Sequence, residues 1–306
     1  MSRFYHALKE ASRSKLNGNP VGSEEALASA VDELLNEPTT SRPVRPHASE
    51  PDPQRIETPA LPHDELTDLA PQPQDALRAS EIPKIAFDPK ARLIMNAADS
   101  VVAEHYQRLR TKIEQQRSTK PFRSLIVVSP SPQEGKTVTV LNLGLSFASL
   151  PSYKVLVVDG DLRRGNIGTL LGVENHPGLT NLIDGSAKLE DAVLRCADIP
   201  IHFLLRGNSE MSPAELLHSP QLGKQFRRIS EQFDLVLVDS APVNLVADTQ
   251  LLAGCCDAVL LVARAFSTTR KSLEQAVQDL SPFRIIGTVL NGGPRSQVYR
   301  RYKGYY

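Results

Sequence analysis

A glycine, a lysine and a threonine in succession, Gly135, Lys136 and Thr137, are the residues of this sequence most readily tied to a chemistry. They end a loop, residues 129–137, that follows a short apolar run and precedes a stretch with helical character. In that setting backbone N–H groups turn toward a phosphate, and the start of the helix adds positive potential. The lysine would reach the β- and γ-phosphates of a nucleotide, and the threonine hydroxyl would bind Mg²⁺. These three residues therefore predict a site for ATP with Mg²⁺.

The loop departs from the general phosphate-binding pattern at one position. That pattern has a glycine five residues before Gly135, where this chain has Pro130. Because the letters Gly-Lys-Thr often arise by chance, their place between a strand and a helix matters as much as the letters themselves.

Three carboxylates stand where two other apolar runs end. Asp159 and Asp161 follow one run, and Asp239 follows another. The carboxyl ends of parallel strands are where such a sheet gathers its ligand-binding residues. Magnesium prefers oxygen ligands and takes one or two carboxylates together with phosphates and water. We therefore expect Asp161 and Asp239 to lie near Thr137, while for any single aspartate the competing interpretation is a cap on the next helix.

The apolar runs that would position these residues alternate with helical segments. The runs are rich in Val, Ile and Leu, as in strands covered on both faces, and they span residues 124–129, 154–159, 201–205, 233–239, 258–263 and 285–290. The helical segments span residues 97–116, 137–150, 189–196, 221–232 and 268–280. This alternation predicts an α/β fold with a doubly wound, mostly parallel sheet and right-handed crossovers.

Composition divides the chain into four parts. Of the 23 prolines, 11 fall between Pro38 and Pro89, and the stretch has a single aromatic residue. We interpret the parts as an N-terminal segment (1–36) with weak helical patterns, a disordered linker (37–96), a nucleotide-binding domain (97–298) and a tyrosine-rich tail (299–306). The N-terminal segment fits a docking peptide and a frayed terminus equally well.

Net charge, cysteine spacing and hydropathy limit the kinds of partner and the cellular compartment to be expected for this protein. The formal net charge is zero, which gives no global electrostatic reason to expect a nucleic-acid partner. Cys196, Cys255 and Cys256 lack metal-ligand spacing and fit a reducing compartment. No run approaches the roughly 20 apolar residues that span a bilayer, and the N-terminus lacks the apolar core of a signal peptide. We therefore expect a cytoplasmic protein without a membrane span or a nucleic-acid partner.

The motifs together resemble the bacterial tyrosine autokinases of capsule and exopolysaccharide synthesis, P-loop ATPases related to the division- and partition-type proteins. Residues 132–137 (Pro-Gln-Glu-Gly-Lys-Thr) are similar to that family's loop, with Gln133 in place of a glycine. The Asp-Gly-Asp-Leu-Arg-Arg sequence in residues 155–164 resembles its most specific motif. Residues 207–217 and 233–242 resemble two more of its motifs. The resemblance extends from about residue 97 to the end of the chain.

The resemblance implies a role for each residue of the site. The nucleotide would lie on Pro132, Gln133, Glu134, Gly135, Lys136, Thr137 and Val138. Lys136 would hold the phosphates, Thr137 and Asp161 would bind the metal, and Asp239 would orient it through water. Asp159 is the candidate for helping to deprotonate the attacking tyrosine, although an ordinary carboxylate is a poor base for a phenol of pKa ~10. Lys136, Asp159, Asp161 and Asp239 form the predicted catalytic set.

The resemblance also implies an acceptor, an assembly and a partner. The acceptor is the tail, whose Tyr299, Tyr302, Tyr305 and Tyr306 a neighbouring subunit would phosphorylate in trans. Residues 104–110 resemble an oligomerisation helix, with Gln107 where an arginine is expected, so Glu104, Arg108 and Arg110 become the residues expected at a homo-oligomer interface. A membrane chain-length-control protein, a polysaccharide co-polymerase, would recruit the chain to the inner face of the plasma membrane.

Two other functions fit part of the sequence. A partition- or division-type switch ATPase shares the fold, but such proteins usually carry a further lysine where this chain has Ser131. A catalytically weakened scaffold of the polysaccharide assembly machinery fits the departures at Pro130, Gln133 and Gln107. The Asp-x-Asp pair argues against this scaffold function.

Overall fold

The computed structural model describes residues 80–82, 100–173, 175–197 and 199–293. Its strands are β1 (Ser80–Ile82), β2 (Ser124–Val128), β3 (Val155–Asp159), β4 (Val193–Cys196), β5 (Ile201–Leu204), β6 (Leu235–Asp239), β7 (Ala258–Arg264) and β8 (Ile285–Asn291). Its helices are α3 (Ser100–Thr119), α4 (Lys136–Ala148), α5 (Ile167–Leu171), α6 (Leu179–Asp184), α7 (Leu189–Ala192), α8 (Pro213–His218), α9 (Pro220–Gln232), α10 (Asp248–Ala253) and α11 (Arg270–Asp279).

The strands form one eight-stranded sheet in the order β1-β4-β5-β3-β6-β2-β7-β8. Every neighbouring pair is parallel except β4 and β5. All residues of β2, β3 and β6 are buried, which explains their continuous Val, Ile and Leu content. In the pairing of β3 with β6, Asp159 lies opposite Asp239. The predicted fold class is confirmed, and the sheet register already brings two predicted site residues together.

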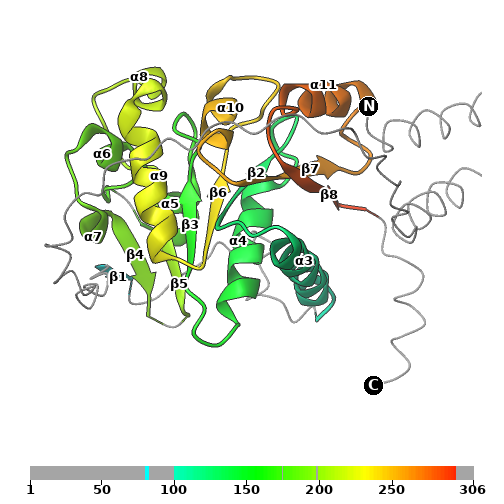
Figure 1. Cartoon of the computed structure of the whole chain (residues 1–306), viewed down its shortest axis with the longest axis horizontal. Helices are drawn as coiled ribbons and strands as arrows, with labels where there is room; N and C mark the ends of the chain where they lie inside the picture. Colours follow the sequence, from blue (N-terminus) through cyan, green and yellow to red (C-terminus); the bar gives the residue numbers. More distant parts are fainter. Residues whose placement is uncertain (1–79, 83–99, 174, 198, 294–306) are drawn as a thin grey trace, which may run out of the picture. The chain divides into compact units, whose positions relative to one another are not determined.

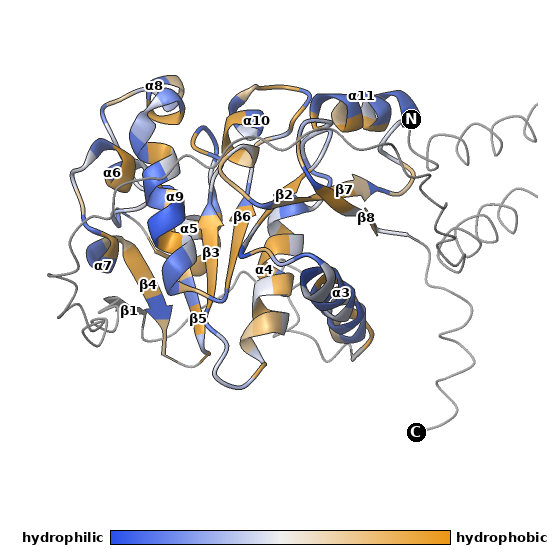
Figure 2. Cartoon of the chain, viewed as in Figure 1, coloured by the Kyte–Doolittle hydropathy of each residue, from blue (hydrophilic) through white to orange (hydrophobic). Residues whose placement is uncertain are grey.

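Helices cover both faces of the sheet (Figure 1). One face packs under α3, α4 and α5, through side chains such as Ile113, Leu141 and Ile167. The other face packs under α6, α8, α9, α10 and α11, with Phe226 and Leu252 among its buried residues. The central strands are hydrophobic, whereas α3 and α11 carry many hydrophilic residues on their outer surfaces (Figure 2). None of the described helices is long and apolar enough to cross a membrane.

The stretch 207–217 owes its pattern to the start of α8. Ser212 accepts a hydrogen bond from the backbone N–H of Glu215 (3.3 Å), and the Glu215 carboxylate accepts one from the N–H of Ser212 (2.8 Å). This reciprocal capping box, with Pro213 in the first turn, starts the helix. Leu216 and Leu217, which follow in α8, are buried in the hydrophobic cluster on this face of the sheet.

The structure corrects the predicted helix over residues 189–196. The helix α7 ends at Ala192, and Val193–Cys196 form β4, which pairs antiparallel with β5. Val193, Leu194 and Cys196 are buried while Arg195 is exposed, a pattern that fits a strand and a helix alike. Four residues after a short helix, three of them apolar, cannot separate these two possibilities by sequence pattern alone.

A second difference concerns the range interpreted as linker, residues 37–96. Ser80–Ile82 within it form β1, an edge strand that pairs in parallel with β4. The remainder of that range, the N-terminal segment and the tail lie outside the described residues, so the four domain boundaries stay predictions. The short helices α5, α6, α8 and α10 were not predicted, because five or six residues are too few for a 3.6-residue period to repeat.

Arg117 connects the end of α3 to the amino ends of three strands. Its Nε donates to the carbonyl oxygen of Phe122 (2.9 Å) and its Nη2 to that of Asp234 (2.7 Å), while Nη1 donates to the hydroxyl of Tyr153. The guanidinium also lies 5.7 Å from the ring centre of Phe122. One side chain therefore joins α3 to the segments that lead into β2, β3 and β6.

Replacing Arg117 should destabilise the domain. We expect Arg117→Met to lower the free energy of unfolding by about 1–3 kcal/mol, because it leaves carbonyl oxygens and a phenol without their donor. Urea denaturation followed by circular dichroism measures the change. Lys112→Met, an exposed lysine on the same helix, is the matched control and should change stability by less than about 0.5 kcal/mol. Equal effects of the two substitutions would contradict this role of Arg117.

Candidate nucleotide-binding site

A hydrogen bond between Thr137 and Asp239 lies at the centre of the site. Thr137, the second residue of α4, donates from Oγ1 to Oδ2 of Asp239 over 2.6 Å. Asp239 is the last residue of β6, which pairs with β2. The structure thus joins the loop to a predicted acid across 102 residues of sequence.

Gly135 is the residue on which the close packing of the loop depends. It has φ 95°, a left-handed conformation that favours glycine. A Cβ atom there would lie 2.0 Å from Nδ2 of Asn291, and this same Nδ2 donates to the carbonyl oxygen of Glu134 (3.0 Å). Any other residue would therefore be strained and would displace the asparagine that holds the loop against the end of β8.

The turn between β7 and α11 holds the loop from a second side. The buried carboxylate of Glu134 accepts hydrogen bonds from the N–H of Ser131 (2.9 Å) and from Oγ1 of Thr268 (2.5 Å). Arg264 donates from Nη1 to the carbonyl oxygen of Gln133 (2.7 Å). The loop is consequently positioned before any ligand arrives.

Gln133 occupies the position where the resembled family has a glycine. Its φ is 60°, in the left-handed region that costs an L-amino acid roughly 1–2 kcal/mol. The hydrogen bond from Arg264 holds its carbonyl oxygen in this conformation. The missing glycine thus appears in the structure as local backbone strain, while the loop keeps its contacts.

Lys136 is buried, with 8% of its surface exposed. Burial lowers the pKa of its ammonium group, and the carboxylates of Asp239, Asp161 and Glu134 act in the opposite direction. These three acids come from the end of β6, from the turn after β3 and from the loop itself. The lysine therefore lies near Asp161 and Asp239, two of the three predicted acids.

The two facing aspartates have unusual acidities. Burial, together with the nearby Asp239, raises the pKa of Asp159 to about 7. Burial also raises the pKa of Asp239 to about 6, against the hydrogen bond from Thr137 and the charge of Lys136, which lower it. Bringing two carboxylates into one buried place makes their joint ionisation costly unless a cation accompanies them.

Unsatisfied oxygens indicate where such a cation would bind. Oδ1 of Asp159 and Oδ1 of Asp239 are buried and find no hydrogen-bond donor among the described residues. In the same residues, no group of three or more His, Cys, Asp or Glu side chains could hold a metal by itself. Mg²⁺ takes only one or two carboxylates with a hydroxyl, phosphates and water. The donor set at Thr137 and Asp239 fits Mg²⁺ bound together with a nucleotide.

Backbone groups orient the two aspartates after β3. Asp161 accepts hydrogen bonds at Oδ1 from the N–H groups of Arg163 (3.2 Å) and Arg164 (2.9 Å). Asp159 accepts one at Oδ2 from the N–H of Ile167 (3.0 Å), the first residue of α5. Asp159 therefore accepts from the first N–H of α5, although Asn166 is the N-cap residue of that helix, and it still lies in the site.

Several residues that shape the site were missed from the sequence. Gly165 is one, because a Cβ there would lie 2.5 Å from Oδ1 of Asp159. Arg163 is another, since its guanidinium binds the Asp248 carboxylate through two contacts, at 2.6 and 3.1 Å, and so ties the Asp-x-Asp turn to α10. The Leu-Arg-Arg letters were a signal for Arg163; nothing in the pattern pointed to Thr268 or Asn291.

The remaining predicted residues divide into three groups. Pro132 and Gln133 are exposed and Val138 is half-buried. Glu104 and Arg108 are exposed on α3, whereas Arg110 donates hydrogen bonds to the carbonyl oxygen of Ser146 and to Oγ of Ser149 (2.9 Å), both at the end of α4. The four tail tyrosines lie outside the described residues. The oligomerisation and phosphorylation roles therefore stay predictions.

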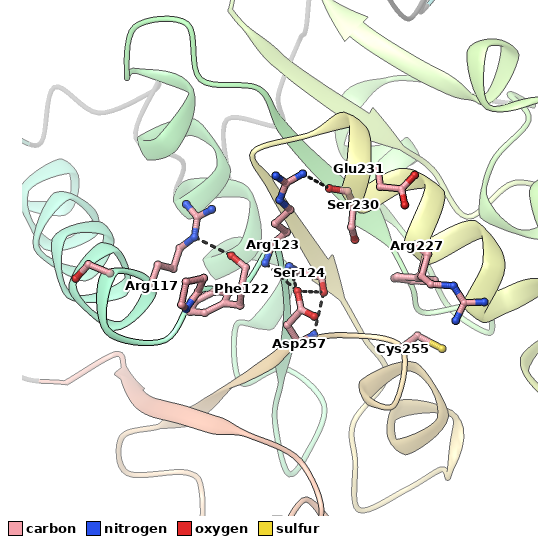
Figure 3. A pocket seen from close by; sticks show the side chains of 12 residues that line it. Arg117, Phe122, Arg123, Ser124, Arg227, Ser230, Glu231, Cys255 and Asp257 are labelled. Carbon is pink, nitrogen blue, oxygen red and sulfur yellow. Dashed lines mark hydrogen bonds between the residues drawn. The ribbon is translucent and has the colours of Figure 1, made fainter. Parts of the chain in front are cut away.

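A pocket of about 710 Å³ lies at the amino ends of the strands, away from the P-loop (Figure 3). Arg123 and Ser124, where β2 begins, and Asp257, just before β7, line it. Oδ2 of Asp257 accepts hydrogen bonds from the backbone N–H groups of Arg123 and Ser124. Its position at the amino ends of the strands separates this pocket from the loop and the acids.

A phosphate-binding loop at the start of a buried helix, facing acids at the ends of parallel strands, defines a P-loop nucleotide-binding protein.

Comparison with known proteins specifies the class further. A family model described as AAA domain matches residues 133–284. The tyrosine-protein kinase YwqD of Bacillus subtilis (strain 168) is 31% identical over 216 residues, which are 70% of this chain and 90% of YwqD. The tyrosine-protein kinase ptk of Acinetobacter johnsonii is 31% identical over 214 residues, which are 70% of this chain and 28% of ptk. The solved VpsO kinase domain is 28% identical, with a TM-score of 0.58, over 64% of this chain and 98% of that domain.

The chain therefore belongs to the family of bacterial tyrosine-protein kinases. The family that the motifs resembled is confirmed, and with it protein-tyrosine kinase activity on an ATP-binding P-loop domain. This membership favours the kinase over the switch ATPase. The chain spans nearly all of YwqD and about a quarter of ptk, at 90% and 28% of their lengths.

The raised pKa values of the facing aspartates predict a dependence of stability on pH. In the absence of Mg²⁺ the native state keeps protons on Asp159 and Asp239 that the unfolded chain, with ordinary aspartate pKa values, has released. The free energy of unfolding should therefore fall as the pH rises from about 4 to about 7, by on the order of a few kcal/mol.

The variant Asp159→Asn should flatten this profile and should be more stable than the wild type at pH 8 without metal. Chemical denaturation from pH 4 to pH 8 in EDTA measures it, with the exposed Asp191→Asn as the control. A profile for Asp159→Asn that keeps the full slope of the wild type would contradict the assignment of this dependence to Asp159.

Proposed function

We propose that this tyrosine-protein kinase transfers the γ-phosphoryl group of Mg-ATP to the tyrosines of its own C-terminal tail. The observation that carries the proposal is the 2.6 Å hydrogen bond from Thr137 to Asp239, beside a buried lysine and a carboxylate oxygen without a donor. These groups are the ones that phosphoryl transfer requires, since that reaction depends mainly on positioning and on charge stabilisation.

Thr137, Asp161 and Asp239 would hold the magnesium ion. Thr137 and Asp239 already share a hydrogen bond, and Asp161 is oriented by two backbone N–H groups. When bound, Mg²⁺ neutralises charge on the phosphate oxygens. The Thr137 hydroxyl donates its hydrogen to Asp239, so the lone pairs of its oxygen would be available to the metal.

Lys136 would hold the β- and γ-phosphates. The burial of Lys136 keeps water away from its ammonium group. Phosphate oxygens of the bound nucleotide would then take the place of the three acids as its partners. The first N–H groups of α4 have no partner within the helix, as at any helix start. They are therefore further donors for the phosphates that Lys136 would hold. A negatively charged γ-phosphoryl group therefore meets a preformed positive environment.

Asp159 would orient the attacking tyrosine hydroxyl and accept its proton. In the metal-free site the pKa of Asp159 is about 7, so this carboxylate binds a proton more readily than an ordinary aspartate does. Its Oδ2 is held by Ile167, and its Oδ1 has no donor among the described residues. One oxygen thus fixes the side chain while the other is available to a substrate hydroxyl.

The acceptor would be the tyrosine cluster of a neighbouring subunit. Tyr299, Tyr302, Tyr305 and Tyr306 lie beside Arg300, Arg301 and Lys303. Each phosphate adds about −1.5 to −2 charges, so modification would convert a basic tail into an acidic one. Phosphorylation would then weaken every contact that uses those cations, and this gives the reaction a regulatory consequence.

The regulated process would be capsule or exopolysaccharide synthesis, through a membrane chain-length-control protein that docks the chain at the plasma membrane. Support comes from the family motifs, which resemble those of the kinases of capsule and exopolysaccharide synthesis.

Removing the lysine should abolish the reaction. We expect Lys136→Met to reduce phosphotyrosine formation with Mg-ATP by roughly 100-fold or more, because it removes the charge that faces the transferred group. Mass spectrometry of the tail peptide measures the product, with Lys112→Met as the control. The assay is run alone and with the cytoplasmic segment of the chain-length-control protein. ATP hydrolysis without phosphotyrosine under both conditions would contradict the proposal.

A mixing experiment tests the trans reaction. One chain carries Lys136→Met with its tail intact, and the other has a wild-type site with all four tail tyrosines changed to Phe. Phosphotyrosine on the Lys136→Met chain is expected only if one subunit modifies another. A mixture that stays unlabelled, while the wild-type chain alone is labelled, would show that the reaction occurs within one chain.

A further inference from the structure

We infer that Phe266 is the residue on which the base of the nucleotide stacks. This inference rests on the proposed nucleotide site and names a determinant of that site outside the P-loop and the acids. Phe266 lies in the turn between β7 and α11, and 91% of its surface is exposed.

The backbone of the turn is held tightly, although its aromatic side chain contacts little. Phe266 has φ 61°, a left-handed conformation that is rare for a bulky residue. Thr268 donates its backbone N–H to the carbonyl oxygen of Arg264 (2.9 Å), and Ala265 donates to that of Asn291 (2.8 Å). Strain of this kind persists where the surrounding structure imposes it, and it concentrates at ligand sites.

The same turn is bonded directly to the P-loop. Arg264 donates to the carbonyl oxygen of Gln133, and Thr268 donates to the carboxylate of Glu134, at 2.7 and 2.5 Å. Phe266 lies between these two residues in the chain. Its ring is therefore presented at the margin of the phosphate-binding loop by a rigid turn.

The order of the strands determines which side of the loop receives the base. The acids that would hold the metal follow β3 and β6, which lie on one side of β2, whereas β7 and β8 lie on the other side. The metal accompanies the β- and γ-phosphates, so the α-phosphate, ribose and base must lead away from β3 and β6. They lead toward the turn that carries Phe266.

Stacking on a base explains Phe266 better than docking of another protein. The exposed large apolar residues among those the structure describes are Met211, Leu245, Phe266 and Leu290. They stand on separate elements, and Leu290 points to the opposite face of β8 from Asn291, which contacts the loop. Single exposed side chains on separate elements differ from the contiguous apolar patches that protein partners bind. A single exposed ring suits a flat heterocycle, whose π-face stacks on aromatic side chains.

The test compares ATP with inorganic tripolyphosphate, a ligand that has the phosphates without the base. By isothermal titration calorimetry in Mg²⁺, Phe266→Ala should weaken ATP binding by about 5- to 150-fold, the range of base–aromatic stacking. Binding of tripolyphosphate should stay unchanged, and Phe266→Tyr should restore ATP affinity. Leu290→Ala is the matched control, because it removes another exposed apolar side chain, on the face of β8 opposite Asn291.

A fluorescence measurement gives an independent readout. The chain contains no tryptophan, so Phe266→Trp creates a single reporter at the proposed stacking position. Its emission should be quenched by ATP and left unchanged by tripolyphosphate. Thermal unfolding of each variant verifies that the fold is retained.

The outcomes separate this inference from the function on which it rests. If the wild type binds ATP and Phe266→Ala binds it equally well, the inference is overturned while the nucleotide site stands. Unchanged ATP affinity together with an altered oligomeric mass would overturn it in favour of protein docking. If the wild type binds neither ATP nor tripolyphosphate, both the nucleotide site and the stacking role fail.

Discussion

The pairing of β3 and β6 beside β2 is the constraint on which the other features of the site depend. It places Asp159 opposite Asp239 at the ends of two buried strands, and it brings Asp239 within 2.6 Å of the Thr137 hydroxyl. Strands covered on both faces cannot shift register without exposing apolar side chains, so the relative positions of these groups are fixed by the hydrophobic core. The acids are consequently held together in a buried place, and burial, with a smaller contribution from neighbouring carboxylates, raises their pKa values.

The loop is preorganised by residues that do not take part in the chemistry. Glu134, Arg264, Thr268 and Asn291 form a hydrogen-bonded clamp that joins the P-loop to the ends of β7 and β8. This clamp and the acids occupy opposite sides of β2. A nucleotide bridging the two sides would contact a rigid support along its whole length, which reduces the entropy lost when it binds.

Two kinds of feature could be predicted from the sequence: elements whose apolar residues follow a regular pattern, and residues that stand at a fixed place in such elements. Buried strands show continuous apolar runs, and the acids at their ends follow from the rule that parallel strands gather ligands at their carboxyl edge. The sequence predicts helix over the short strand β4, because its four residues, three of them apolar, show no clear period. The clamp escaped prediction because its contacts, such as Arg264 to Gln133 across 131 residues, depend on turn geometry that no local pattern encodes.

The buried helix α4 links the two regions that assembly and catalysis would use. Its first turn carries Lys136 and Thr137, while Arg110 from α3 donates to the carbonyl oxygen of Ser146 in its last turn. A helix of 13 residues is a stiff rod of about 20 Å, and a cation at its carboxyl end also complements its dipole. If a neighbouring subunit displaced α3, the helix α4 would move as a rigid body. Lys136, at the other end of α4, would then move with it.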